Sequence, residues 1–426
     1  MFDSLAPMPT DADEAALAER VAALERLKSA AAAEQARVTA LWDERRRRAE
    51  AELGLPAARR GRGLAAEVAL ARRDSPNRGG RHLGFARALV HEMPHTYAAL
   101  RSGVLSEWRA TLIVRESACL DLEDRRALDA EMCGRPADLE GLGDARIAAR
   151  AKEIAYRLDP RAVVDRAVRA EQDRTVTIRP APDAMTYVTA LLPMPQGVSV
   201  YAALTKAADA RADGRGRGQT MADTLVERVT GRAADVPVPV AVNVVLSDRS
   251  LLDGADEPAR VTGYGPMPAG LARRLIRRAL DDERSRATLR RLYAEPRSGA
   301  LVAMESRSRL FPKALGRFLE VRDDTCRTPF CDAPIRHRDH ATPVRRGGAT
   351  SATNGIGLCE ACNYAKEAPG WVTDAGHDGH GRHVVHVTTP TGMRRRSVAP
   401  PLPGCDRLDW SEVELRIGVD VTGHAA

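Results

Sequence analysis

The sequence is poor in lysine, in aromatic residues and in long apolar runs. Only five of its 65 basic residues are lysines, and none of the five follows a glycine. This excludes a Walker A loop, because that loop needs a Gly-Lys pair at the phosphates. Aromatic residues make up 4% of the chain, which argues against a platform that stacks single-stranded bases. No uninterrupted apolar run reaches about 18 residues, so no membrane span is predicted.

The N-terminus also lacks the basic start and apolar run of a secretory signal, since it carries the acids Asp3, Asp11, Asp13 and Glu14. We therefore expect a cytoplasmic protein without a membrane partner. Hydrophobic residues make up 44% and charged residues 29%, which is typical of a globular chain with a sizeable core. A length of 426 residues suggests two or three domains at ~150 residues each. The net charge of +7 permits a polyanionic partner without requiring one.

The cysteines are distributed unevenly along the chain. Cys119, Cys133 and Cys405 stand alone. The other four form two short pairs, Cys326-x4-Cys331 and Cys359-x2-Cys362. Two such pairs suit tetrahedral zinc, because each pair can hold the ion from one tight turn. Disulfides or buried thiols are the alternative, but in a reducing compartment the clustering favours zinc.

The N-terminal part of the chain predicts helices. Residues 11–53 are rich in Ala, Leu, Glu and Arg, and we expect one long helix within residues 1–60. Its expected apolar stripe comprises Val21, Leu24, Leu27 and Ala31, which leaves open a homodimer that pairs through this helix. Residues 64–174 continue the helical pattern, and glycines and prolines separate successive segments.

Strands enter after residue 174. Residues 175–179, 185–192 and 236–245 predict strands, with helices expected at 200–212 and 221–229. The glycine-rich segment that precedes the second helix follows a helical run, not a strand, so it predicts a connector instead of a dinucleotide site. We therefore expect residues 61–300 to form a helical and mixed α/β domain.

Polar residues between the cysteine pairs are suited to chemistry. Asp339 and His340 lie at a predicted strand end, Asn354 follows a loop-like segment, and Asn363 directly follows the last cysteine. Histidine deprotonates water near neutral pH, and phosphodiester hydrolysis also needs a divalent cation that neutralises charge on the phosphate. Oxygen ligands such as Asp339 and Asn363 suit Mg²⁺. These residue types together predict a phosphodiester-cleaving site beside the zinc.

The order of these residues resembles the HNH endonuclease motif of the ββα-metal superfamily, since DH-x-x-P, GG, N, LCxxCN and K follow one another. The resemblance implies that DNA is the partner and that His340 is the general base. It implies that Asp339 and Asn363 hold the catalytic Mg²⁺ or another divalent cation, and that Asn354 holds the loop that orients His340. The chain departs from many relatives at Gly355, where they have leucine.

The resemblance also implies structural Zn²⁺ on four residues, namely Cys326, Cys331, Cys359 and Cys362. Lys366, Arg345 and Arg346 are expected to contact DNA phosphates. The rival interpretation is a catalytically inactive, zinc-dependent nucleic-acid-binding protein.

A second resemblance covers most of residues 20–410. The lead-in at 290–326 and the segment GYGPMP at 263–268 are similar to actinobacterial HNH proteins with a long N-terminal domain of unknown function. We expect an α+β protein, mostly helical at the N-terminus with a small mixed α/β unit, followed by a zinc-stapled ββα-metal module at 301–375. A C-terminal hairpin and tail are expected at 376–426, because glycines around His377, His380, His383 and His386 favour a hairpin over a second metal site.

Overall fold

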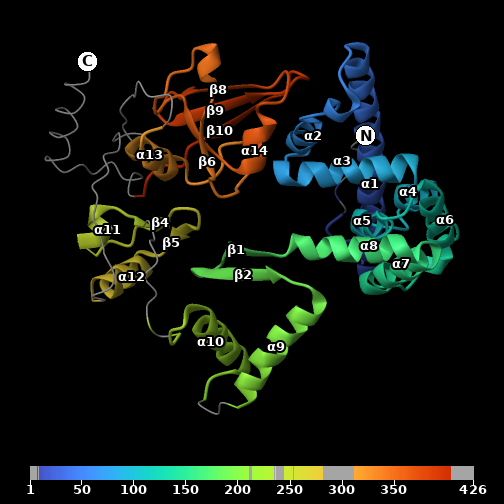
Figure 1. The fold of residues 1–426 in the computed structure, drawn as a ribbon, viewed down its shortest axis with the longest axis horizontal. Helices are drawn as coiled ribbons and strands as arrows, with labels where there is room; N and C mark the ends of the chain where they lie inside the picture. The colour runs from blue at the N-terminus through green and yellow to red at the C-terminus, as the bar shows by residue number, and fades with distance from the viewer. Residues whose placement is uncertain are drawn as a thin grey trace. The chain divides into compact units, whose positions relative to one another are not determined.

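Figure 1 draws the computed structural model of the chain. It describes residues 7, 9–210, 214–234, 236, 244–252, 254–281 and 311–403. The chain divides into two compact units, Met1–Gln172 and Asp173–Ala426. The first is helical and the second combines helices with small antiparallel sheets, so the predicted α+β class is confirmed. The domain boundaries expected after residues 60, 300 and 375 stay predictions.

The helical unit (Met1–Gln172) consists of α-helices joined by short turns (Figure 1). In chain order they are α1 (Glu14–Glu52), α2 (Leu64–Arg72), α3 (Pro76–His91), α4 (Pro94–Ser102), α5 (Glu107–Glu116), α6 (Leu122–Cys133), α7 (Asp144–Leu158) and α8 (Pro160–Ala170). Short 3₁₀ turns lie at η2 (Ala57–Arg59), η3 (Pro136–Leu139) and η4 (Glu171–Asp173). Asp13, Ser106 and Asp121 cap α1, α5 and α6, because each side chain accepts a hydrogen bond from a backbone N–H of the first turn. The expected long N-terminal helix is confirmed as α1.

Three apolar clusters form the core of the helical unit. One includes the fully buried residues Met93, Leu105, Leu128 and Ile147. In this cluster, burial raises the pKa of the Cys133 thiol to about 11, as is typical of an inert core cysteine. A second cluster packs the alanines of α1 against α3 and α4. The third joins Leu64 and Val68 of α2 to Leu83 of α3.

The face of α1 that packs differs from the predicted one. Val21 is 68% and Leu27 39% exposed, whereas Ala33 and Ala40 are fully buried. The predicted stripe was therefore wrong: the neighbouring helices contact α1 farther along, through small side chains that let helices approach closely. Homodimerisation through α1 stays a prediction. None of the described helices is long and apolar enough to cross a membrane.

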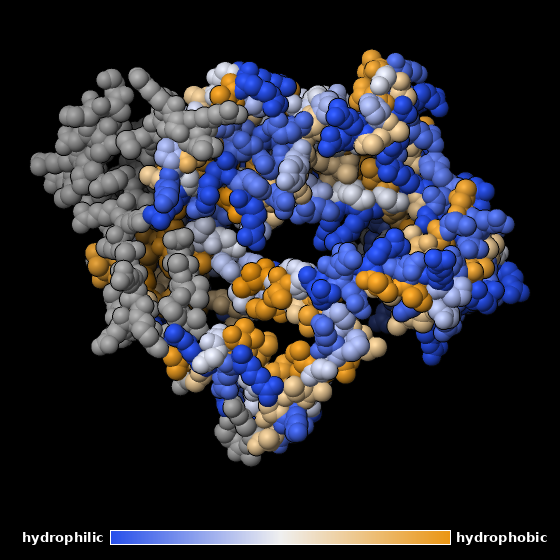
Figure 2. Space-filling model, viewed as in Figure 1, coloured by the Kyte–Doolittle hydropathy of each residue, from blue (hydrophilic) through white to orange (hydrophobic). Residues whose placement is uncertain are grey.

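The second unit begins with an antiparallel hairpin and a helix pair. Strand β1 (Thr175–Ala181) pairs with β2 (Met185–Leu191), and α9 (Met194–Asp209) packs on α10 (Arg217–Thr230). These elements confirm the two strands and two helices expected here. Figure 2 shows apolar side chains gathered over the hairpin and the helix pair. The exposed apolar residues of these elements include Met185, Val188 and Val198.

A small sheet follows, with strand order β3-β4-β5. Its elements are β3 (Val244–Val245), α11 (Asp248–Leu252), β4 (Ala259–Val261), β5 (Gly265–Met267) and α12 (Ala269–Asp281). Most of the third predicted strand, 236–245, lies outside the described residues. The buried Arg260 of β4 donates hydrogen bonds to the carbonyls of Val321 and Pro401, which ties this sheet to the residues that follow.

The C-terminal module (residues 311–403) holds the predicted ββα unit. Its elements are α13 (Lys313–Asp323), β6 (His337–His340), η5 (Val344–Arg346), β7 (Gly355–Leu358), α14 (Glu360–Ala365), β8 (Val372–His377), β9 (His383–Thr388) and β10 (Arg394–Val398). Strand β6 pairs with β7 and α14 follows directly, while β8, β9 and β10 form a second antiparallel sheet. The hairpin favoured over a second metal site is confirmed, since His377 pairs with His383 across β8 and β9. The predicted lone Cys405 lies outside the described residues.

Candidate functional site

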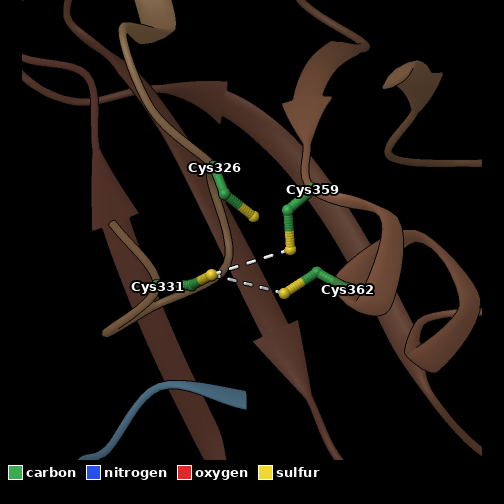
Figure 3. Close-up of side chains that lie close together, drawn as sticks. All are labelled: Cys326, Cys331, Cys359 and Cys362. Atoms are coloured by element: carbon green, nitrogen blue, oxygen red, sulfur yellow. Dashed lines mark hydrogen bonds between the residues drawn. The ribbon is translucent and has the colours of Figure 1, made fainter. Parts of the chain in front are cut away.

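Four cysteines from two parts of the C-terminal module converge on one buried point (Figure 3). Cys326 and Cys331 lie on the loop after α13, and Cys359 and Cys362 lie at the start of α14. Their sulfur atoms all lie within 4.8 Å of one another, with Cys331 Sγ 3.8 Å from Cys359 Sγ and 3.6 Å from Cys362 Sγ. Thiolates at ~2.3 Å from a tetrahedral zinc ion are about 3.8 Å apart. The cluster therefore has the donor type and the spacing for Zn²⁺.

The local backbone explains how the first pair is held. The Cys331 N–H donates to Thr328 O (3.0 Å) and the Cys326 N–H donates to Ala333 O (2.9 Å), which closes a tight turn around Phe330 at φ 64°. The four thiols form no disulfide. The pKa values of Cys331 and Cys362 are raised above the usual range, mainly by hydrogen bonding with the Cys326 thiol. Four adjacent sulfurs cannot all ionise unless a cation neutralises them, and zinc is the cation that this donor set suits.

Strand β6 ends in Asp339 and His340. Adjacent residues of a strand point to opposite faces, and here the His340 side chain is 9% exposed whereas that of Asp339 is 32% exposed. Asp339 Oδ1 nevertheless accepts a hydrogen bond from the His340 N–H (2.8 Å) and lies 3.7 Å from His340 Nδ1. The carboxylate thus curls around the strand end toward the imidazole.

The His340 ring is held from two sides. Its Nε2 lies 2.8 Å from the hydroxyl of the buried Thr350, and its ring centroid lies 4.6 Å from that of Phe311. Sequence reasoning missed both neighbours. Thr350 lies in the polar loop before Asn354, and Phe311 precedes α13, so nothing in the local pattern linked either residue to the histidine.

Asn354 clamps the loop that connects β6 to β7. Its Oδ1 accepts a hydrogen bond from Thr342 N (2.8 Å), and its Nδ2 donates to Thr342 O (2.9 Å) and Ala349 O (2.8 Å). A Cβ at Gly348 would lie 1.8 Å from Thr342 O and 2.7 Å from Asn354 Nδ2. The clamp therefore requires glycine at this position, and it fixes both ends of the segment that carries Thr350.

Gly355 is the residue that departs from many relatives of the motif. A Cβ there would lie 2.7 Å from Phe311 Cε1 and 2.8 Å from Leu319 Cδ1. Phe311 thus occupies the space beside Asn354 that a larger residue at 355 would need, and it contacts the His340 ring from there.

Asn363 presents an oxygen that needs a partner. Helix α14 packs on β6, and Asn363 Oδ1 is buried without a hydrogen-bond partner among the described residues. Leaving a buried acceptor unpaired is costly, and a bound cation or an ordered water would satisfy it. Mg²⁺ prefers oxygen donors, and the Asp339 carboxylate and the Asn363 amide offer two. The donor types of these two residues suit a divalent cation, and their role as its ligands stays a prediction.

Charged side chains surround Asp339. Lys366 Nζ lies 2.8 Å from Asp339 Oδ2 and 2.5 Å from Glu367 Oε1, and its side chain is 8% exposed. The hydrogen bond from Lys366 holds the pKa of Glu367 below its usual value, so Glu367 is ionised at neutral pH. Arg345, with a side chain 65% exposed, pairs with Glu367 Oε2 at 2.8 Å. Arg345, Arg346 and Trp371 line a pocket of about 220 Å³ next to these groups.

A buried ionic network joins α13 to the ββα unit and to the second sheet of the module. Asp323 accepts hydrogen bonds from Arg322 Nε (2.7 Å) and from the Gly357 N–H of β7 (2.8 Å). Arg327 lies 3.6 Å from Asp323 and donates to Ser397 O of β10 (2.8 Å). These residues are nearly fully buried, and they connect α13 and both sheets of the module.

A strand-end histidine and aspartate, a clamping asparagine and a helix-borne asparagine, framed by a four-cysteine cluster, define a ββα-metal nuclease module. Residues 324–368 match the HNH endonuclease family, and residues 15–323 match the domain of unknown function DUF222. The chain therefore belongs to the DUF222 family and carries an HNH endonuclease domain after that region, as predicted. No curated protein and no solved structure is significantly similar to it.

Proposed function

We propose that this protein is a metal-dependent endonuclease that hydrolyses DNA phosphodiester bonds. The observation that carries the proposal is the buried, unpaired Asn363 Oδ1 on the helix that packs against the Asp339–His340 strand end. A module that only bound nucleic acid through its zinc fold would have no need of this acceptor, whereas a catalytic cation satisfies it.

Asp339 and Asn363 are the residues that would hold the cation. When bound, Mg²⁺ neutralises charge on the phosphate and on the leaving oxygen. The adjacent His340 acts as general base toward the attacking water. If its Nε2–H donates to the Thr350 hydroxyl, the lone pair lies on Nδ1, the nitrogen nearer Asp339. Asn354 holds the loop between β6 and β7 in place, and this loop carries Thr350, which contacts the His340 ring.

The remaining residues support binding and structure. Zn²⁺ on the four cysteines would staple α14 to the loop after α13 and thereby fix Asn363 relative to β6. Arg345 and Arg346 are exposed beside the pocket and are our proposed phosphate contacts, which position the DNA without reading its sequence. The Lys366 ammonium points instead to Asp339 and Glu367, so its expected contact with DNA stays a prediction.

Cleavage of supercoiled plasmid tests the proposal. The zinc-loaded full chain is incubated with Mg²⁺ or Mn²⁺ and with EDTA, alongside His340→Ala and the control His386→Ala, which changes an exposed histidine of β9. Loss of a general base slows the reaction by about 10²- to 10⁴-fold, so His340→Ala should nick very slowly and the control normally. Equal rates for the wild type and a folded His340→Ala protein would remove His340 from this role. DNA binding without any metal-dependent cleavage would favour the inactive binding protein.

A further inference from the structure

Lys366 pairs with a carboxylate of the proposed cation site. In a chain whose basic residues are almost all arginine, this lysine buries its stem and places its ammonium on Asp339, one of the two residues offered to the cation. An ammonium is a compact point charge, which mimics a metal ion more closely than a planar guanidinium does. Lys366 and a divalent cation therefore compete for one carboxylate.

Glu367 is the second carboxylate that pairs with the Lys366 ammonium. Its Oε1 lies 2.5 Å from Lys366 Nζ, while its Oε2 is held by Arg345 at 2.8 Å. Arg345, Glu367, Lys366 and Asp339 thus form a row of alternating charges. A cation on Asp339 repels the ammonium but leaves its pairing with Glu367 intact, so Lys366 can withdraw without becoming an unpaired buried charge.

We propose that Lys366 and Glu367 form an electrostatic gate that sets the affinity of the site for its divalent cation. Lys366 occupies Asp339 in the metal-free protein, and Glu367 retains the ammonium when the cation binds. This inference rests on the proposed cation site, and it makes Lys366 and Glu367 positioning residues. The gate weakens cation binding and keeps Asp339 paired with a positive charge until the cation arrives.

Mn²⁺ binding to the zinc-loaded full chain, followed by the electron paramagnetic resonance signal of free Mn²⁺, tests the gate without DNA or turnover. Lys366→Met removes the competitor and should tighten Mn²⁺ binding about 3- to 10-fold, the value of a pairing worth ~1 kcal/mol. Glu367→Gln leaves Asp339 as the main partner of Lys366 and should weaken binding by a similar factor. Lys313→Met and Glu360→Gln change exposed charges of the same module and should alter the affinity less than about 2-fold.

The double variant separates a gate from a general charge effect. If Glu367 acts through Lys366, Glu367→Gln should have no effect on Mn²⁺ affinity in the Lys366→Met background. A persistent weakening there would overturn the gate, as would unchanged or weaker binding by Lys366→Met alone. Asp339→Asn tests the underlying site: if it binds Mn²⁺ as the wild type does, the cation site in the proposed function is wrong. If Asp339→Asn abolishes binding and Lys366→Met does not tighten it, the gate alone fails.

Discussion

The helical unit and the C-terminal module are stabilised in different ways. Of the largest fully buried side chains among the described residues, Leu319 and Ile356 belong to the module and the others to the helical unit. The interior of the module instead contains charged and polar groups such as Asp323, Arg327 and His383, together with four cysteines. The helical unit also buries charged groups, among them Asp43, Glu67 and Asp129, but most of its interior is apolar. The module has fewer large apolar side chains and relies more on its hydrogen-bonded network and its cysteine cluster. The same bonds position His340 and Asn363, so stability and chemistry are linked there and separate in the helical unit.

Removal of zinc should produce the largest difference in stability between the helical unit and the C-terminal module. Structural zinc contributes ~10 kcal/mol or more to the folding of small metal-binding units. A strong chelator, or Cys362→Ser, should therefore unfold the C-terminal module while the helical unit stays folded. Amide hydrogen exchange of the full chain measures both regions at once: β6, β7 and β9 should lose protection, and α4 to α7 should keep it. Cys119→Ser, outside the cluster, is the control. Protection of β6 and β7 that survives metal removal would contradict a zinc-dependent module.

The two regions also differ in what their sequence predicts. Short cysteine spacings tie the ligands to tight turns, so the cluster was predictable from local chemistry, and it is confirmed by the sulfur distances. The order of Asp339, His340, Asn354 and Asn363 also predicts a shared site, because ligand and base types follow from the reaction, and their roles there stay predictions.

Packing between distant segments was less predictable. The face of α1 that packs is marked by alanines and not by large apolar residues, so hydrophobic periodicity indicated Val21 and Leu27 instead. Within the module, Phe311 and Thr350 reach His340 from other segments of the chain. Such contacts depend on how elements pack, and no local pattern encodes them. The sequence therefore predicted which segments of the module are loops and strands, whereas only the structure shows which residues contact His340.

A substitution in the core of the helical unit should destabilise that unit and leave the C-terminal module unchanged, which is the opposite of the effect of zinc removal. Leu128 of α6 is fully buried, and Leu128→Ala should destabilise the helical unit by about 2–5 kcal/mol through lost contacts and a cavity. Exchange should accelerate in α4 to α7 and stay unchanged in the C-terminal module. Leu122→Ala in the same helix removes a side chain that is 49% exposed and should have an effect of about 0.5 kcal/mol or less. Faster exchange in β6 and β7 on Leu128→Ala would show that the two regions do not unfold independently.

Acid should destabilise the C-terminal module through His383. This residue is 2% exposed and its Nε2 lies 2.8 Å from Thr353 O, beside the Asn354 clamp. Burial, with the nearby Arg322 charge, lowers the pKa of His383 to about 3. The unfolded chain, with an ordinary histidine pKa of ~6.5, binds a proton that the folded module excludes, so stability is present above pH ~6.5 and falls as the pH drops toward 3. Between pH 7 and pH 5 this single group should cost about 2 kcal/mol.

The contribution of His383 is isolated by comparing variants, because other groups also titrate in this range. His383→Gln keeps an amide donor for Thr353 O but has no proton to exclude, so its stability should fall by about 2 kcal/mol less than that of the wild type between pH 7 and pH 5. Hydrogen exchange in β7 and β9 measures the difference, and His386→Gln, an exposed change on the same strand, should behave like the wild type. An identical pH slope in His383→Gln would mean that His383 is not the acid-sensitive group. The helical unit should show no change in either variant, since His383 and its hydrogen-bond acceptor Thr353 both lie in the C-terminal module.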